Sequence, residues 1–192
     1  MDRYNEFNPV LNSVAQSIGG IYDRKKKTVR VSYGYWDIVF KQDKRDSYYI
    51  TSIRTVYLYN SDLKFSVVKR EFSHKLFRLR GIKTGNSDFD NFCYIKGNDT
   101  LKIKDIFKYE EIQLLLMRVF RFCPQSYLKI GARKIFIWNR RPKGLDELIF
   151  VSMDYVNRED LIKDFFCIIK RIIDALVKSN LMIAQRPNYK IA

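Results

Sequence analysis

Residues 158–178, with the sequence REDLIKDFFCIIKRIIDALVK, contain the strongest helical pattern in the chain. Apolar side chains recur at helical spacing and form one wide stripe, while charged side chains and Cys167 cover the opposite side. Asn157 stands directly before this segment and is expected to cap the helix. A stripe of this width has to be buried, and we therefore expect the helix to lie across a β-sheet.

Several segments upstream alternate apolar and polar residues or are dense in β-branched and aromatic residues, which is typical of strands. Strands are expected at Thr28–Tyr33, Tyr35–Phe40, Tyr48–Tyr59, Leu63–Val68, Phe77–Arg80, Ser126–Ile130, Lys134–Trp138 and Leu148–Met153. Gly34 separates the first two, and Gly131-Ala132 separates Ser126–Ile130 from Lys134–Trp138. Each of these two pairs is expected to form a hairpin.

Two further helices are expected before the C-terminal one. The first runs from about Pro9 to Ile18 and is stopped by Gly19-Gly20, and the second region runs from Leu101 to Phe120, with a break near Lys108. The chain of 192 residues has only four prolines and eight glycines and no Gly/Ser-rich linker. The pattern predicts one α+β domain over residues 1–192, with a largely antiparallel sheet packed by the long C-terminal amphipathic helix.

The net charge of +15 is concentrated in three segments. The 34 residues from Ile112 to Leu145 contain no Asp or Glu and eight cations, which are Arg118, Arg121, Lys129, Arg133, Lys134, Arg140, Arg141 and Lys143. Arg24–Arg30 adds five cations without an acid, and Lys64–Lys83 adds seven against the single Glu71. A composition set by AT-rich coding would raise the lysine content, but it would not readily clear acids from one stretch. Such a field attracts polyanions.

Aromatic residues interleave with these cations. Arg78 and Arg80 alternate with apolar residues and should leave one face of a strand, while two basic pairs bracket the expected strand that ends at Trp138. A basic sheet surface with exposed rings suits single-stranded or irregular RNA, because cations meet phosphates and rings stack on bases. The alternative is a solvated basic face with rings at its rim. The candidate anion-binding residues are Arg78, Arg80, Arg118, Arg121, Arg133, Lys134, Trp138, Arg140 and Arg141.

The sequence shows no convincing catalytic site. His74 is the only histidine, so it has no second histidine with which to form a metal site or relay. Asp88, Asp90 and Asp99 lie among Asn, Ser and Gly, which is the ordinary chemistry of turns and helix caps. Cys123 stands two residues from Arg121, which could lower the pKa of its thiol, but a nucleophile also needs a base, and the chain has one candidate. No phosphate-binding glycine loop occurs, and no metal or cofactor is expected.

The cysteines and the lack of long apolar segments indicate where in the cell the protein is expected. Cys93, Cys123 and Cys167 are widely spaced among apolar residues, which predicts buried thiols in a reducing compartment. Met1–Gly20 has no continuous apolar run typical of a secretory signal, and no window has the length of a membrane span. We expect a cytoplasmic protein without a transmembrane segment.

The segment Thr84-Gly85-x-x-Asp88-Phe89-Asp90-x-Phe92, followed by Gly97-Asn98-Asp99 and a helix, resembles a pattern of an uncharacterised bacterial domain family. The resemblance covers roughly Leu11 to Lys178. In that family a leading helix and several strands precede the segment, a hairpin and a terminal helix follow it, and membrane helices often adjoin the domain. The resemblance implies one domain and a scaffold or membrane-proximal role, and it implies no catalytic residues.

These observations favour a non-catalytic binding module. The leading hypothesis is nucleic-acid binding by backbone and shape, as an accessory subunit of a prokaryotic complex, with single-stranded or structured RNA as the favoured ligand. The alternative is an interaction protein that docks to an acidic protein or to an anionic membrane surface. The oligomeric state is open.

Overall fold

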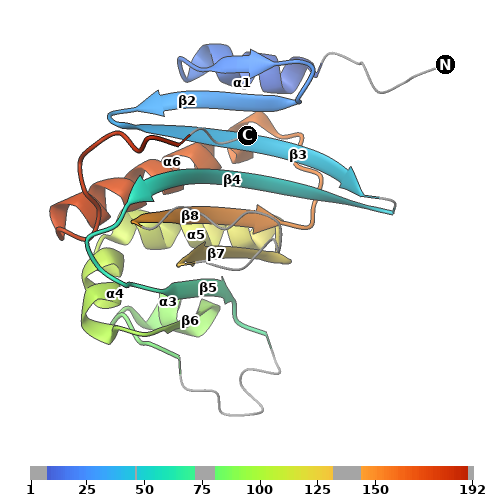
Figure 1. Cartoon of the computed structure of the whole chain (residues 1–192). Coiled ribbons are helices and arrows are strands. Elements are labelled where there is room, and N and C mark those ends of the chain that lie inside the picture. Colours follow the sequence, from blue (N-terminus) through green and yellow to red (C-terminus); the bar gives the residue numbers. More distant parts are fainter. Residues whose placement is uncertain (1–7, 46, 72–80, 132–143, 190–192) are drawn as a thin grey trace.

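The computed structural model describes residues 8–45, 47–71, 81–131 and 144–189 (Figure 1). The strands are β1 (Ile21–Asp23), β2 (Thr28–Tyr33), β3 (Trp36–Arg45), β4 (Tyr48–Leu58), β5 (Phe65–Lys69), β6 (Cys93–Gly97), β7 (Ser126–Ile130) and β8 (Leu145–Ser152). The helices are α1 (Pro9–Ser17), α3 (Ser87–Phe92), α4 (Thr100–Phe107), α5 (Glu110–Phe122) and α6 (Glu159–Lys178).

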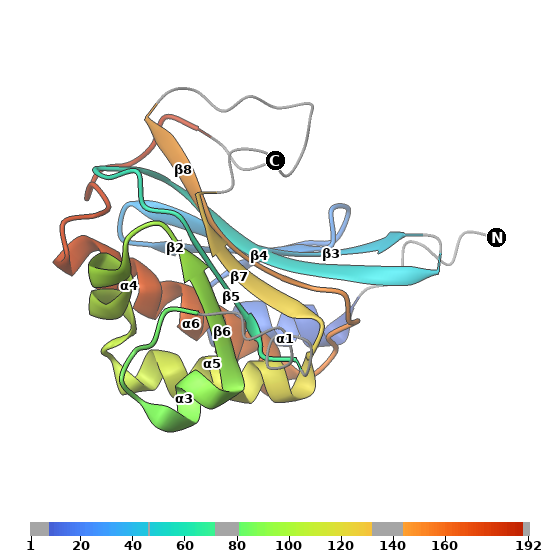
Figure 2. The same cartoon turned by 90° about the horizontal axis from the view of Figure 1, so that it is seen from below.

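The described strands form one eight-stranded sheet in the order β1-β2-β3-β4-β8-β7-β5-β6. Every neighbouring pair is antiparallel. The sheet twists strongly, and the helices lie together on one of its faces (Figures 1 and 2). The predicted α+β domain, with an antiparallel sheet and a long C-terminal helix packed on it, is confirmed.

Helix α6 supplies much of the core between the two layers. Its apolar stripe is buried, and the rings of Phe165 and Phe166 lie 6.3 and 6.2 Å from the ring of Phe40 on β3. Phe165 also lies 4.9 Å from Phe150 on β8. The stripe predicted from the sequence therefore packs on the central strands of the protein's own sheet.

The start of α6 corrects one prediction. The N-cap residue is Arg158, not Asn157, and no side chain caps the helix end by a hydrogen bond. The Arg158 guanidinium instead contacts the Asp160 carboxylate in the first turn, at 2.7 Å from Nη2 to Oδ2. Acidic Glu159 and Asp160 offset the positive end of the helix dipole, so charge takes the place of a capping hydrogen bond.

The strand predictions are confirmed in the described residues, with shifts at their ends. β3 runs on to Arg45 and β8 begins at Leu145. Both strands are therefore longer than the segments predicted from the sequence. β7 matches the predicted Ser126–Ile130, and its described partners are β5 and β8. The predicted strands at Phe77–Arg80 and Lys134–Trp138, and with the latter the hairpin across Gly131-Ala132, fall outside the described residues.

The segment between β5 and α4 contains the helix α3 and the strand β6, and the residues around Asp88, Asp90 and Asp99 are the ones expected to form turns and caps. Asn86 caps the short helix α3 through its Oδ1, which accepts from the backbone amides of Asp88 and Phe89. The buried Asp90 carboxylate accepts from the Thr84 amide and hydroxyl and from the Gly85 amide. Asp99 accepts from the Lys102 amide at the start of α4, which holds the pKa of Asp99 below its usual value. These residues therefore serve turns and caps.

The expected break near Lys108 is confirmed, because α4 ends at Phe107 and α5 begins at Glu110. The buried Gln113 amide donates to the Phe107 carbonyl at 2.5 Å and accepts from Asn86 at 2.6 Å. One side chain thus satisfies a helix-end carbonyl and joins three helical elements.

The face of the sheet opposite the helices has two unlike halves. Over β3, β4 and β8, the segment that leads to the C-terminus lies on the sheet, where Tyr189 packs on Val39, Val56 and Leu145 (Figure 2). Arg186 approaches the Asp37 carboxylate at 3.8 Å. The other half, over β7, β5 and β6, carries the residues described in the next section.

Candidate nucleic-acid interface

Two of the nine predicted anion-binding residues, Arg118 and Arg121, are in the described part of the chain, and both project from α5. The other seven predicted residues lie outside it, namely Arg78, Arg80, Arg133, Lys134, Trp138, Arg140 and Arg141. His74 lies outside it as well.

Arg118 is engaged by carboxylates of α6. Its Nη2 lies 3.1 Å from Asp160 Oδ2 and its Nε lies 2.9 Å from Asp164 Oδ2. Burial raises the pKa of Asp164, and the guanidinium of Arg118 opposes that rise. Arg118 therefore ties α5 to α6, and its charge is already compensated within the protein.

Arg121, in the last turn of α5, has different surroundings. Its guanidinium lies 5.7 Å from the centroid of the Phe92 ring at the end of α3, and the ammonium of Lys69 lies 5.7 Å from the same centroid. Among the described residues no carboxylate lies within 4.0 Å of either cation. We call Lys69 and Arg121 the Phe92 cation pair; within the described residues each contacts an aromatic ring and no carboxylate.

The half of this face over β7, β5 and β6, which we call the open half to distinguish it from the half under the C-terminal segment, presents a regular array of tyrosines and lysines. On β5, Phe65 and Val67 are buried on the helix side, so Ser66 and Val68 point to the open face. Val68 stands opposite Tyr94 on β6 and opposite Tyr127 on β7. One pleat further along, Ser66 stands opposite Lys96 and Lys129. We call Tyr94, Lys96, Tyr127 and Lys129 the tyrosine–lysine platform.

The spacing of this platform follows from sheet geometry. Strands lie about 4.8 Å apart, so two side chains on either side of β5 are separated by about 10 Å. Tyr94 and Tyr127 are both half-buried, and the ring of Tyr94 packs against the backbone of Gly81, where an added Cβ would meet Tyr94 Cδ2 at 2.9 Å. Burial and the nearby Glu147 carboxylate raise the pKa of Tyr127, so its hydroxyl is neutral and a donor at physiological pH.

The electrostatics of the two halves of the open face also differ. On the covered half, cations meet carboxylates, with Arg30 at 3.1 Å from Asp37 and Lys41 at 2.9 Å from Asp43. β5, β6 and β7 contain no acidic residue, and within the described residues no carboxylate pairs with Lys96 or Lys129. The charge of these two lysines is therefore not paired with a carboxylate within the described part of the chain.

Arg70 extends this charge to the end of β5. Its guanidinium lies 5.5 Å from the centroid of the Tyr94 ring, and its Nε donates to the carbonyl of Cys93 at 3.4 Å. The guanidinium plane is itself a surface on which bases stack. Arg70 thus continues the platform toward the Phe92 cation pair.

Sequence reasoning missed the platform, although part of its signal was visible. The strands SYLKI and CYIKG both carry a tyrosine and, two residues later, a lysine on the same face. Nothing in the sequence indicates that β5 joins them, since β7 follows β6 with two helices between. The array exists only through this non-sequential pairing.

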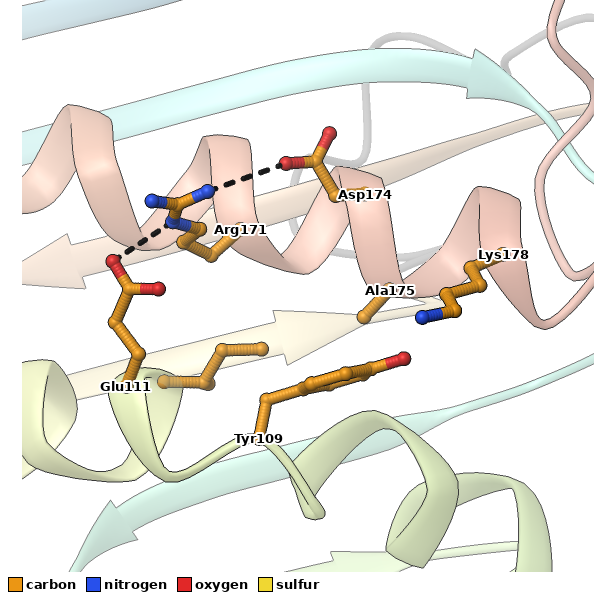
Figure 3. A pocket seen from close by; sticks show the side chains of 7 residues that line it. Tyr109, Glu111, Arg171, Asp174, Ala175 and Lys178 are labelled. Carbon is orange, nitrogen blue, oxygen red and sulfur yellow. Dashed lines mark hydrogen bonds and ion pairs between the residues drawn. The ribbon is translucent and has the colours of Figure 1, made fainter.

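A cleft between α5 and α6 is a second candidate site (Figure 3). It has a volume of about 190 Å³, and its walls include Glu111, Arg171, Asp174 and Lys178. Arg171 Nε lies 2.8 Å from Glu111, whose hydrogen bond raises the pKa of the guanidinium, and Arg171 Nη1 lies 3.9 Å from Asp174. These charges largely compensate one another and join the two helices, which is a packing role.

The described cysteines do not form an activated nucleophile. Burial raises the pKa of Cys93 to about 12 and that of Cys123 to about 11, and it also raises the pKa of the half-buried Cys167. The idea that Arg121 lowers the pKa of Cys123 is wrong, because desolvation dominates. No group of three or more His, Cys, Asp or Glu side chains suited to a metal occurs in the part of the chain that the structure describes.

Comparison with family models, with curated proteins and with solved structures finds no match to this chain. Within the described ranges, no helix is both long and apolar enough to cross a bilayer.

Proposed function

We propose that this protein is a non-catalytic nucleic-acid-binding module and that single-stranded RNA binds across the tyrosine–lysine platform. The observation that carries the proposal is the array itself, in which two tyrosines and two lysines stand in register on β6 and β7, on either side of β5, and none of these three strands contains a carboxylate. Lysines neutralise phosphates, and aromatic rings stack on bases of any sequence. Recognition is then by backbone and shape.

The two rows of the platform divide these tasks. The row formed by Lys96, Ser66 and Lys129 supplies charge and a hydroxyl, and the row formed by Tyr94, Val68 and Tyr127 supplies rings and an apolar floor. The rows are about 7 Å apart along the strands, because residues on one face repeat every two positions. A strand of RNA can place its phosphates over one row while its unstacked bases reach the other.

The wider setting of the proposal rests on the sequence. The remaining basic candidates Arg78, Arg80, Arg133, Lys134, Arg140 and Arg141, together with Trp138, are proposed as additional contacts. We further propose a cytoplasmic accessory subunit of a prokaryotic complex. The proposal for the platform stands on the described residues alone.

Binding of fluorescent single-stranded RNA of about twelve nucleotides, followed by anisotropy over a salt series, tests the proposal. Replacing Tyr94 and Tyr127 by Leu keeps apolar contact but removes the rings, and it should lose about 1–3 kcal/mol for each base that stacks. Reversing Lys96 and Lys129 to Glu should flatten the log–log salt slope by about 0.7 for each lost phosphate contact.

The matched control reverses Lys25 and Lys26, which are exposed in the turn between β1 and β2 at the opposite edge of the sheet. It changes the net charge equally and should alter binding much less. Equal losses in both charge variants, with no effect of the Leu variants, would contradict the platform. Binding only to anionic vesicles, or to a copurifying acidic protein, would instead support the interaction protein that the basic surface also allows.

A further inference from the structure

Cations at the end of β5 lie on both faces of the sheet. Consecutive residues of a strand point to opposite faces, so Arg70 lies on the open face beside Tyr94 while Lys69 lies on the helix side beside Phe92. Arg121 reaches the same ring from the C-terminal turn of α5. Three cations from two elements thus wrap around one end of the sheet.

Two cations, Lys69 and Arg121, contact the Phe92 ring. Each cationic centre lies 5.7 Å from the ring centroid, and the half-buried ring fixes where the flexible side chains end. The quadrupole of the ring compensates a cation only in part. Within the described residues, the acids of the neighbouring α3 do not pair with Lys69 or Arg121. Asp90 is buried and accepts from the turn at Thr84, and Asp88 is exposed in the first turn of α3.

We infer that RNA bound on the platform continues around the end of β5 and that the Phe92 cation pair holds its next phosphates. The inference rests on the proposed function and extends it to a second contact on the other side of the sheet. The path then has an order, from Lys96 and Lys129, past Tyr94 and Tyr127, over Arg70, to Lys69 and Arg121. A short oligonucleotide can occupy the platform alone, whereas a longer one also reaches the pair.

The test compares two lengths of single-stranded RNA, about three and about twelve nucleotides, on the Lys69→Glu/Arg121→Glu double variant of the full chain. For the long RNA the log–log salt slope should flatten by about 1.4, because two phosphate contacts are lost at about 0.7 each. For the short RNA the slope should stay at its wild-type value. Phe92→Leu keeps the apolar contact but removes the ring, and it should weaken binding of the long RNA alone.

The Lys25→Glu/Lys26→Glu variant again controls for net charge, and thermal unfolding reports on the fold of each variant. A loss of the same size for both RNA lengths, or a loss no larger than that of the control, would overturn the inference and leave the platform in place. Failure of wild-type protein to bind either length better than the platform variants would overturn both proposals. Retention of the wild-type slope on the long RNA would show that the cation pair only stabilises the end of α5.

Discussion

Gly97, the last residue of β6, occupies a position that has no room for a side chain. A Cβ there would clash with Ile103 Cδ1 and would lie 2.6 Å from the Lys64 carbonyl oxygen and 2.9 Å from Phe65 Cβ. Two of these three atoms belong to the backbone or to a Cβ and cannot move aside without shifting β5. The residue therefore fixes how closely β6 and α4 approach the strand at the centre of the platform.

Gly97→Ala should destabilise the protein by about 1–3 kcal/mol, because overpacking forces the neighbouring backbone to move. Urea unfolding followed by circular dichroism measures the change. Gly19→Ala is the comparison, since a Cβ there meets nothing within 4 Å and only the positive φ of 67° opposes the substitution. A Gly97 variant as stable as the Gly19 variant would show that β6 can shift without loss.

Arg118 and Arg121 illustrate how far single residues could be predicted. Both were identified as candidate anion contacts because they lie in a stretch without acids. The carboxylates that engage Arg118 come from α6, more than forty residues later, and only the packing of α5 on α6 brings them near. Local composition shows where positive charge is, but compensation is a property of the tertiary structure.

At the scale of elements, periodicity predicted most of the strands and helices but not the neighbours of β5. Alternation shows that FSVVK has one buried face, and the same holds for SYLKI and CYIKG. The side-by-side placement of these strands depends on long-range pairing, so the platform could not be predicted. The cap of α6 was also misplaced, because an ion pair at Arg158 replaces the expected side-chain cap.

The contact between α5 and α6 leads to a pH-dependent prediction. Arg118→Met should lower the free energy of unfolding by up to about 1 kcal/mol at neutral pH, since the pair is partly exposed. Asp164 then keeps only the weaker influence of Arg158, and its pKa, already raised by burial, should rise further. Asp160 keeps Arg158, which holds its pKa below the usual value.

The sign of the pH dependence follows from the raised pKa of Asp164. The folded state favours the protonated carboxyl of Asp164. The loss of stability caused by the ionised carboxylate is therefore present at neutral pH and disappears as the pH falls through the pKa of Asp164 in the folded state. Unfolding free energies of Arg118→Met and wild type should therefore converge toward acidic pH. Lys104→Met, an exposed change on α4, serves as the control. A difference that stays constant with pH would indicate lost packing of the arginine stem instead.

For the whole molecule, the net charge of +15 makes self-repulsion a measurable part of stability. Raising the salt concentration from about 0.01 M to about 0.1 M shortens the Debye length from about 30 Å to about 10 Å. The Tm should rise over this range, because screened repulsion between the basic segments outweighs the weakening of exposed ion pairs. Thermal unfolding over a series of NaCl concentrations measures this change in Tm. A falling Tm would show that the ion pairs of α5 and α6 dominate.

The position of β8 in the sheet has a consequence for synthesis of the chain. β8 is buried on both faces and joins β1–β4 to β7, β5 and β6, yet among the described strands Leu145–Ser152 is the last to be synthesised. A nascent chain that ends before Leu145 leaves the edges of β4 and β7 without the strand that separates them. Such edges recruit other strands. A growing chain is therefore expected to expose the edges of β4 and β7 until Leu145–Ser152 has left the ribosome.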